Sequence, residues 1–347
     1  MLELILGVSL VGALTFYLLF GGADFGAGIW SLFAFGRDGW KQRTLIDQAI
    51  GPIWEANHVW LIIAVTILFT AFPAAFAAIT TSLHIPLSLM LIGVVLRGTA
   101  FAVRTHDITS RTDGRSSTPA IWRYLFAGSS LVTPALLGVS LGAIASGRLG
   151  QGLPSSTSFT DRFVSPWLAA FPLSVGLFTS VLVAYLAAVY LLVECREQKL
   201  QDLFRRRAIA AWCAVALAAP LALYESRAGA PEIYRGLLHT GMGLAAILLT
   251  AAVSVAALIA LWKGRDRVAR WFAAAEAVLM LWGWSLSQFP FLVEPDLTIY
   301  HAAPPPTLRL LVLSLAGGSI ILFPLLFYLY RLFKGHFLSG ADASMKP

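Results

Sequence analysis

Long apolar runs follow one another along the chain, and short polar segments separate them. A transmembrane α-helix needs about 20 predominantly apolar residues, and a membrane barrel strand needs about half as many. The second and third runs are divided only by Phe72, Pro73 and a few small residues. The pattern therefore predicts nine membrane helices, at residues 4–35, 52–76, 79–103, 121–145, 166–193, 208–224, 238–262, 271–289 and 307–330.

The composition supports a membrane protein of helical type. Of the 347 residues, 58% are hydrophobic and 12% are charged, and the mean hydropathy is +0.76. A soluble domain could not bury that much apolar surface, and the runs are longer than barrel strands require. We expect an all-α integral membrane protein, with residues 1–347 forming a single polytopic membrane domain. Spans one and five share a direction, which suggests two four-helix bundles plus one peripheral helix.

The 25 basic residues are unevenly distributed between the two sides of the predicted helices. Most lie after spans one, three, five and seven and in the C-terminal tail. Because cytoplasmic loops carry the excess of Lys and Arg, this places the N-terminus outside and the C-terminus in the cytoplasm. The net charge of +7 is explained by orientation and does not indicate nucleic acid. Acidic Glu3 stands where a basic signal-peptide region would lie, so we expect a retained first helix.

A carboxylate within the first apolar run is the most informative polar residue. Asp24 lies in GGADFGAGIW, between Gly22 and Gly26. Placing a charge at the bilayer centre costs several kcal/mol, so such residues face the protein interior or water and mark ion or proton paths. No cation stands near Asp24 in its own predicted helix, which favours a functional role.

A second polar group opens the second span, in GPIWEANHVWL (residues 51–61). Glu55 and His58 are three residues apart and so share a helical face, whereas Asn57 lies about 100° from His58 around the axis. Of the six histidines, only His58 falls inside a predicted span, so a bis-histidine haem site in this chain is not expected. Trp54 and Trp60 flank the acid and could line a quinone or lipid site.

Two interpretations of these side chains stay open on the residues alone. Asp24, Glu55 and His58 could form a proton-uptake path from the cytoplasm, or the buried charges could be structural ion pairs that lock helices together. Arg97 in the third span is the expected structural counter-ion of Asp24 or Glu55, because a buried acid needs a cation or a water chain beside it. For Glu276 in the eighth span we favour a structural role.

These motifs resemble subunit II of the cytochrome bd quinol oxidases. In that family the first helix carries a Gly-Phe-Asp-Leu-Gly-like motif, and the second opens with Gly-Pro-Val-Trp-acid-x-Asn-x-Val-Trp-Leu. Here the matching segments are residues 22–26 and 51–61, and the resemblance continues with Leu96-Arg97-Gly98 and Phe101. Late in the chain it includes Trp282-Gly283-Trp284, Gln288-Phe289-Pro290, Pro295-Asp296-Leu297-Thr298, Ala302-Ala303-Pro304 and residues 328–334.

The resemblance implies a nine-helix subunit of a terminal oxidase in the bacterial inner membrane, with no haem or metal of its own. A partner subunit I would carry two b-type haems and haem d, oxidise quinol and reduce oxygen to water. Asp24 and Glu55 match the acids that the family uses to deliver cytoplasmic protons. Small accessory subunits and a structural quinone or lipid are further partners compatible with the family.

The sequence departs from the better-known members at two positions. They have Asp where Glu55 stands and Glu where His58 stands, so the route could be rewired or could use His58 as a relay. In this the chain also resembles the cyanide-insensitive branch. Two alternatives from other classes remain: a secondary transporter whose ion site uses Asp24 in a broken helix, and a purely structural assembly subunit.

Overall fold

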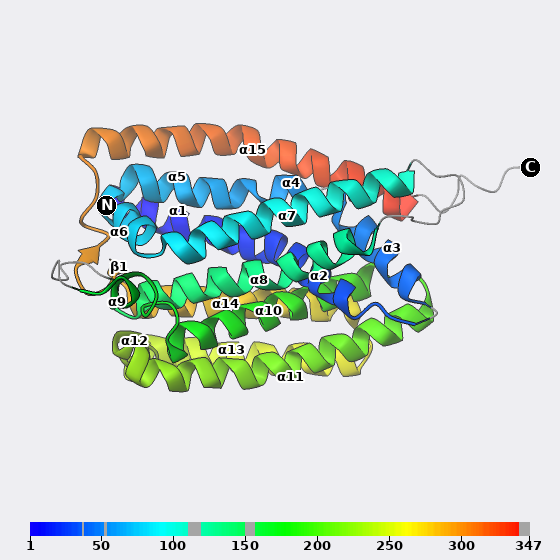
Figure 1. Cartoon of the computed structure of the whole chain (residues 1–347). Coiled ribbons are helices and arrows are strands. Elements are labelled where there is room, and N and C mark those ends of the chain that lie inside the picture. Colours follow the sequence, from blue (N-terminus) through cyan, green and yellow to red (C-terminus); the bar gives the residue numbers. More distant parts are fainter. Residues whose placement is uncertain (37, 52–53, 110–118, 150–156, 340–347) are drawn as a thin grey trace, which may run out of the picture.

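The computed structural model describes residues 1–36, 38–51, 54–109, 119–149 and 157–339, and these residues are almost entirely helical (Figure 1). Pro52 and Ile53 of the second motif lie outside the described residues. The helices run alongside one another in a single elongated array. Helix α1 begins at one end of this array, and helix α15 ends at the other (Figure 1).

The elements follow in chain order. They are α1 (Leu2–Phe16), a π-helical segment η1 (Tyr17–Gly22), α2 (Ala23–Leu32), α3 (Gly39–Ile50), α4 (Trp54–Asn57), α5 (Val59–Ala71), α6 (Pro73–Ser82), α7 (His84–Thr109), α8 (Ala120–Ala145), α9 (Phe159–Phe163), α10 (Ala170–Glu194), α11 (Gln198–Gly229), α12 (Pro231–Leu238), α13 (Gly241–Trp262), α14 (Asp266–Gln288), β1 (Phe291–Val293), β2 (Leu297–Thr298) and α15 (Pro305–Ser339).

Eight helices in the described part of the chain are long and apolar enough to cross a membrane. The first of them joins α1, η1 and α2 into one helical path, Leu2–Leu32, and the second joins α4 and α5 as Trp54–Ala71. Helix α14 corresponds to the eighth predicted span and is not one of these eight, but its 23 residues run alongside the others. The all-α membrane fold with about nine helices is confirmed.

The boundary between the second and third predicted spans was wrong. Helix α5 ends at Ala71, and residues 73–82 form a separate short helix, α6, before α7 begins at His84. Proline lacks an N–H and fixes its own φ, so Pro73 favours the start of a helix over its interior. Phe72 leaves the helical conformation with φ −129° and ψ 58°, and Pro73 follows it at the first helical position.

The helices fall into two groups of four and one peripheral helix, as expected. Helices α10, α11, α13 and α14 contact one another, and the second group contains α1–α2, α4–α5, α7 and α8. Helix α10 joins the groups because it also packs against α2 and α8. Helix α15 lies along α1 and α5 on the outside of the array (Figure 1).

Short elements cover the two ends of the array. Helices α6, α9 and α12 and the β1–β2 hairpin lie at the end where α1 begins, and α3 lies at the opposite end (Figure 1). Helix α3 buries Gln42, Ile46 and Ile50 at intervals of four residues, so one stripe of it faces the array. Ile46 and Ile50 belong to the largest buried apolar cluster, which fixes α3 against the helix ends.

Candidate functional site

Close helix packing positions Asp24. A Cβ atom on Gly26 would lie 1.9 Å from the backbone oxygen of Val183 in α10, and one on Gly28 would lie 2.1 Å from the hydroxyl of Ser130 in α8. A Cβ atom on Gly22 would lie 3.1 Å from the side chain of Val183. Only glycine permits such approaches, so this stretch holds α2 against α8 and α10 in one axial position.

The Asp24 carboxylate is buried and hydrogen-bonded to the second motif. Asp24 is 8% exposed and lies in the first turn of α2, two residues after the π-helical segment η1 ends at Gly22. The side-chain amide of Asn57, which is 2% exposed, donates a hydrogen bond to Asp24 Oδ2 at 2.6 Å. π-Helical segments occur frequently at functional sites, and a charge-assisted bond of this length is a strong one.

His58 interrupts the helix beside this pair. Helix α4 ends at Asn57 and α5 begins at Val59, so His58 occupies the junction. Its half-buried ring lies among aromatic rings, with centroids 5.9 Å from Tyr17, 6.0 Å from Phe25 and 6.3 Å from Trp54. In the described part of the chain, the buried Nδ1 of His58 has no hydrogen-bond partner.

Arg97 supplies positive charge to the same site. Its side chain is 1% exposed, and its guanidinium carbon lies 4.8 Å from the Phe25 ring and 5.5 Å from the Phe126 ring. It interacts electrostatically with Asp24, Tyr17 and His58. The role of Arg97 as the counter-ion of Asp24 stays a prediction. The aromatic faces attract the guanidinium charge, and this attraction partly replaces the water that a buried arginine loses.

Glu55 does not join the buried group. Its side chain is exposed on the surface of this chain, although it is three residues from His58. Although Glu55 and His58 were predicted to share a helical face, the structure does not bring both side chains into the interior. The residue that reaches Asp24 is Asn57, which lies about 200° around the helix axis from Glu55 and so faces the interior when Glu55 faces outward.

A second charged pair lies toward the α3 end, and sequence reasoning missed it. Arg104 donates two hydrogen bonds from Nη2 to Asp47, at 2.8 Å to Oδ1 and 2.9 Å to Oδ2. Burial raises the pKa of Asp47 to about 6, while Arg104 and then Arg43 oppose this rise. Asp47 is next to Ile46 in the buried stripe of α3. The four-residue spacing of Gln42, Ile46 and Ile50 in the sequence could have indicated that this part of the helix is buried.

Trp54 and Trp60 are packing residues in this structure. The Trp54 ring lies against Phe101 at 5.7 Å and fills the space above Gly98, where a Cβ would come within 3.1 Å. The Trp60 ring stacks on Phe16 at 4.3 Å. Neither tryptophan lines the apolar cavity between α10, α11, α13 and α14, and their place beside a quinone or lipid stays a prediction.

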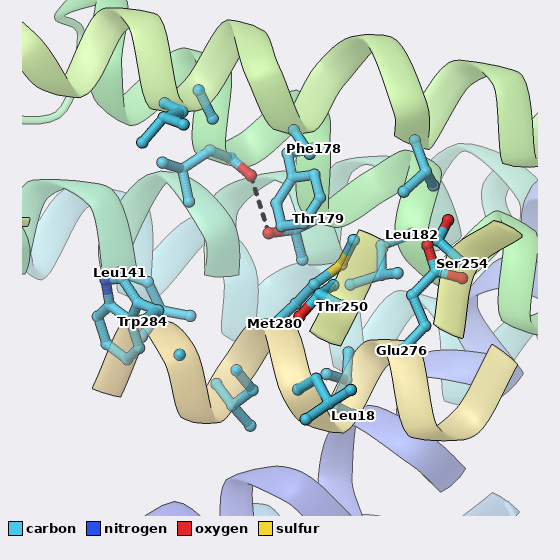
Figure 2. Close-up of a pocket in the computed structure, with 18 of the residues that line it drawn as sticks. Leu18, Leu141, Phe178, Thr179, Leu182, Thr250, Ser254, Glu276, Met280 and Trp284 are labelled. Carbon is cyan, nitrogen blue, oxygen red and sulfur yellow. Dashed lines mark hydrogen bonds between the residues drawn. The ribbon is translucent and has the colours of Figure 1, made fainter. Parts of the chain in front are cut away.

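The cavity has a volume of about 530 Å³ and lies between α10, α11, α13 and α14, with α1 and α8 contributing to its wall. Its lining is mostly apolar. Figure 2 shows Glu276 and Ser254 at one end and Trp284 and Leu141 at the other. Glu276 is 0% exposed, with the hydroxyls of Tyr185 and Ser254 as polar neighbours. In the described part of the chain, no cation is paired with it.

Among the residues that the structure describes, no three His, Cys, Asp and Glu side chains come together as a metal site would require. The model of the family described as cytochrome bd terminal oxidase subunit II matches residues 2–333. The chain belongs to this family. It is therefore a subunit of a terminal oxidase complex, an oxidoreductase, and a multi-pass membrane protein of a bacterial enzyme family.

Individual relatives agree with this assignment to subunit II. The putative cytochrome bd menaquinol oxidase subunit II of Bacillus subtilis (strain 168) is 24% identical over 95% of both chains. Cytochrome bd-I ubiquinol oxidase subunit 2 of Escherichia coli (strain K12) is 30% identical over 44% of this chain and 35% of its own length. A chain of the bd oxidase from Geobacillus thermodenitrificans has the same fold, with a TM-score of 0.77, 24% identity and coverage of 96% and 98%.

Proposed function

We propose that this subunit of a bd-type quinol oxidase delivers cytoplasmic protons toward the oxygen-reducing site of its partner subunit, with Asp24 at the centre of the path. Glu55 would exchange protons at the surface that meets subunit I, and His58 would relay them between that surface and the buried group. Arg97 would be the counter-ion. The observation that carries this proposal is the buried Asp24 carboxylate, bonded to Asn57 close to the π-helical segment of the first membrane helix and to the α4–α5 junction of the second.

The geometry supports a mobile proton better than a structural lock. Asp24 accepts a short hydrogen bond from the neutral amide of Asn57, and Arg97 acts on it electrostatically. An amide N–H can stay bonded to a carboxyl oxygen whether or not the carboxyl group carries a proton, so this bond is compatible with proton uptake. The broken helix also fits the transporter alternative, but membership of the oxidase family argues against that class.

The oxidase chemistry itself belongs to the partner. The haems, two of b type and one of d type, are proposed to lie in subunit I, where quinol would be oxidised and oxygen reduced to water. The named relatives are a menaquinol and a ubiquinol oxidase subunit, which supports quinol as the electron donor of the complex. The proposed location is the inner membrane, with the N-terminus outside and the C-terminus in the cytoplasm.

Oxygen uptake by the purified complex tests the role of Asp24. Asp24→Asn should slow quinol-dependent oxygen uptake at least tenfold, or prevent haem d assembly, while membrane insertion persists. The matched control is Asp38→Asn, because Asp38 is an exposed acid just before α3 that lies 3.9 Å from Lys41. Wild-type turnover with a full haem complement in Asp24→Asn would refute the proposal.

A second pair of variants tests Glu55. Glu55→Gln should slow oxygen uptake more than Glu55→Asp, since only the second keeps a group that can carry a proton. Equal rates for the wild type and both variants would remove Glu55 from the path.

The α10–α14 cavity is the proposed place for a structural quinone or lipid. The mostly apolar wall of this cavity suits a hydrocarbon chain. At one end, Glu276 and the nearby hydroxyl groups could form hydrogen bonds with a polar head group (Figure 2). Solvent extraction of the complex followed by mass spectrometry should recover a stoichiometric amphiphile, and Ala219→Phe, which narrows the cavity, should reduce it. Equal recovery from both proteins would count against this site.

A further inference from the structure

The Asp47–Arg104 pair is continuous with the buried site through aromatic contacts. The Arg104 guanidinium carbon lies 4.5 Å from the Phe126 ring, and the guanidinium carbon of Arg97 lies 5.5 Å from the same ring. Phe126 is fully buried, and Arg97 continues the chain of contacts to Phe25, the neighbour of Asp24. At 1.5 Å per helical residue, Arg104 and Arg97 are about 10 Å apart along α7.

Asp47 is surrounded by more positive charge than it can neutralise. Arg104 faces it from α7 and Arg43 from its own helix, while Arg123 in the first turn of α8 lies close enough to act on Arg43. The side chains of Asp47 and Arg104 are only 12% and 6% exposed, so solvent screens their charges weakly. The docked α3 stripe holds the carboxylate in place, and both of its oxygens bond to Arg104.

From this arrangement we propose that Asp47 is a positioning residue for proton delivery: its negative charge compensates Arg104 and thereby lets protons reach Asp24 from the cytoplasmic end. Without that compensation, two buried cations stacked on Phe126 would stand between the α3 end and Asp24. They would oppose the arrival of a proton and favour the ionised form of the acid. This inference rests on the proposed function of Asp24.

The size of the effect follows from the spacing. At an effective dielectric constant of about 20, a unit charge about 10 Å away, the spacing of Arg104 and Arg97, changes an ionisation equilibrium by roughly tenfold; Asp24 lies beyond Arg97, so the effect on Asp24 is smaller. We therefore expect Asp47→Asn to lower oxygen uptake by the assembled complex several-fold at pH 7.5. Asp47→Glu keeps the charge and should restore most of the rate, and Asp38→Asn on the same helix should leave the rate unchanged.

The pH profile separates this role from a structural one. Because the pKa of Asp47 is about 6, its charge is present above that pH and is lost as the pH falls through it. The ratio of Asp47→Asn turnover to wild-type turnover should therefore approach one near pH 5 and fall to a low plateau above pH 7. A ratio that stays constant between pH 5 and pH 8 would overturn the proposal, since loss of packing alone has that consequence.

A double variant keeps the test decisive if Asp47→Asn assembles poorly. Asp47→Asn combined with Arg104→Gln removes both charges, so it should assemble and turn over faster than the single variant. A double variant no better than the single one would overturn the inference. If Asp24→Asn itself keeps wild-type turnover, the proposed function fails; if Asp24→Asn is slow but the Asp47→Asn ratio is flat, only this inference fails.

Discussion

Gly26→Ala should separate the two helix groups that position Asp24. The new Cβ would lie 1.9 Å from the Val183 oxygen, 2.5 Å from its carbonyl carbon and 2.7 Å from the Ala187 Cβ. The first two atoms belong to the backbone of α10, so no side-chain rotation can relieve the overlap. Restoring ordinary contact at about 3.4 Å requires α2 and α10 to move apart by about 1.5 Å.

The structure indicates how much such a shift should destabilise the protein. Overpacking a well-packed core by one methyl group costs about 1–3 kcal/mol, and contact with backbone places this substitution at the upper end. A loss of about 3 kcal/mol lowers the thermal midpoint of a protein of this size by about 5 °C. The displacement also moves Asp24 away from Asn57, whose hydrogen bond of 2.6 Å leaves little room for movement.

Thermal unfolding and oxygen uptake of the purified complex check both effects. Gly22→Ala is the graded comparison, because its Cβ would meet only the Val183 side chain at 3.1 Å, which can rotate. Gly12→Ala is the control in the same helical path, with no atom within 4 Å of the new Cβ. If Gly26→Ala and Gly12→Ala unfold at the same temperature, helix contact at Gly26 does not position the site.

Two further predictions concern other groups. Asn57→Ala should leave the complex assembled but slow oxygen uptake several-fold, because a hydrogen bond to a charged group contributes about 1.5–3 kcal/mol; an unchanged rate would show that the amide does not hold Asp24. Burial, followed by the nearby Glu232, raises the pKa of Glu294 to about 7. A raised carboxyl pKa means that stability is present at low pH and is lost as the pH rises from about 4.5 through 7. Glu294→Gln should therefore flatten the fall in thermal midpoint between pH 5 and pH 8, and an identical fall in variant and wild type would contradict this.

Hydropathy along the chain determined the membrane class, the approximate positions of nine helices and the two motifs around Asp24 and Glu55. These properties are local, because a spanning helix is a sum over neighbouring residues and satisfies its own backbone hydrogen bonds. The sequence also suggested Arg97 as a candidate counter-ion, since a buried acid in lipid requires charge or water nearby. Phe72 and Pro73 marked the division between the second and third spans in the sequence, but hydropathy did not show that residues 73–82 form a separate short helix.

Tertiary structure alone decided which side chains meet. Contact between Gly26 and Val183 sets the axial position of α2, and these residues are far apart in the sequence. The rotation of the α4–α5 path then points Asn57 toward Asp24 and leaves Glu55 at the surface. Asp47 reaches Arg104 only because α3 docks against the helix ends. Partners of this kind depend on the rotation and offset of packed helices, which a pattern of apolar residues along one chain does not specify.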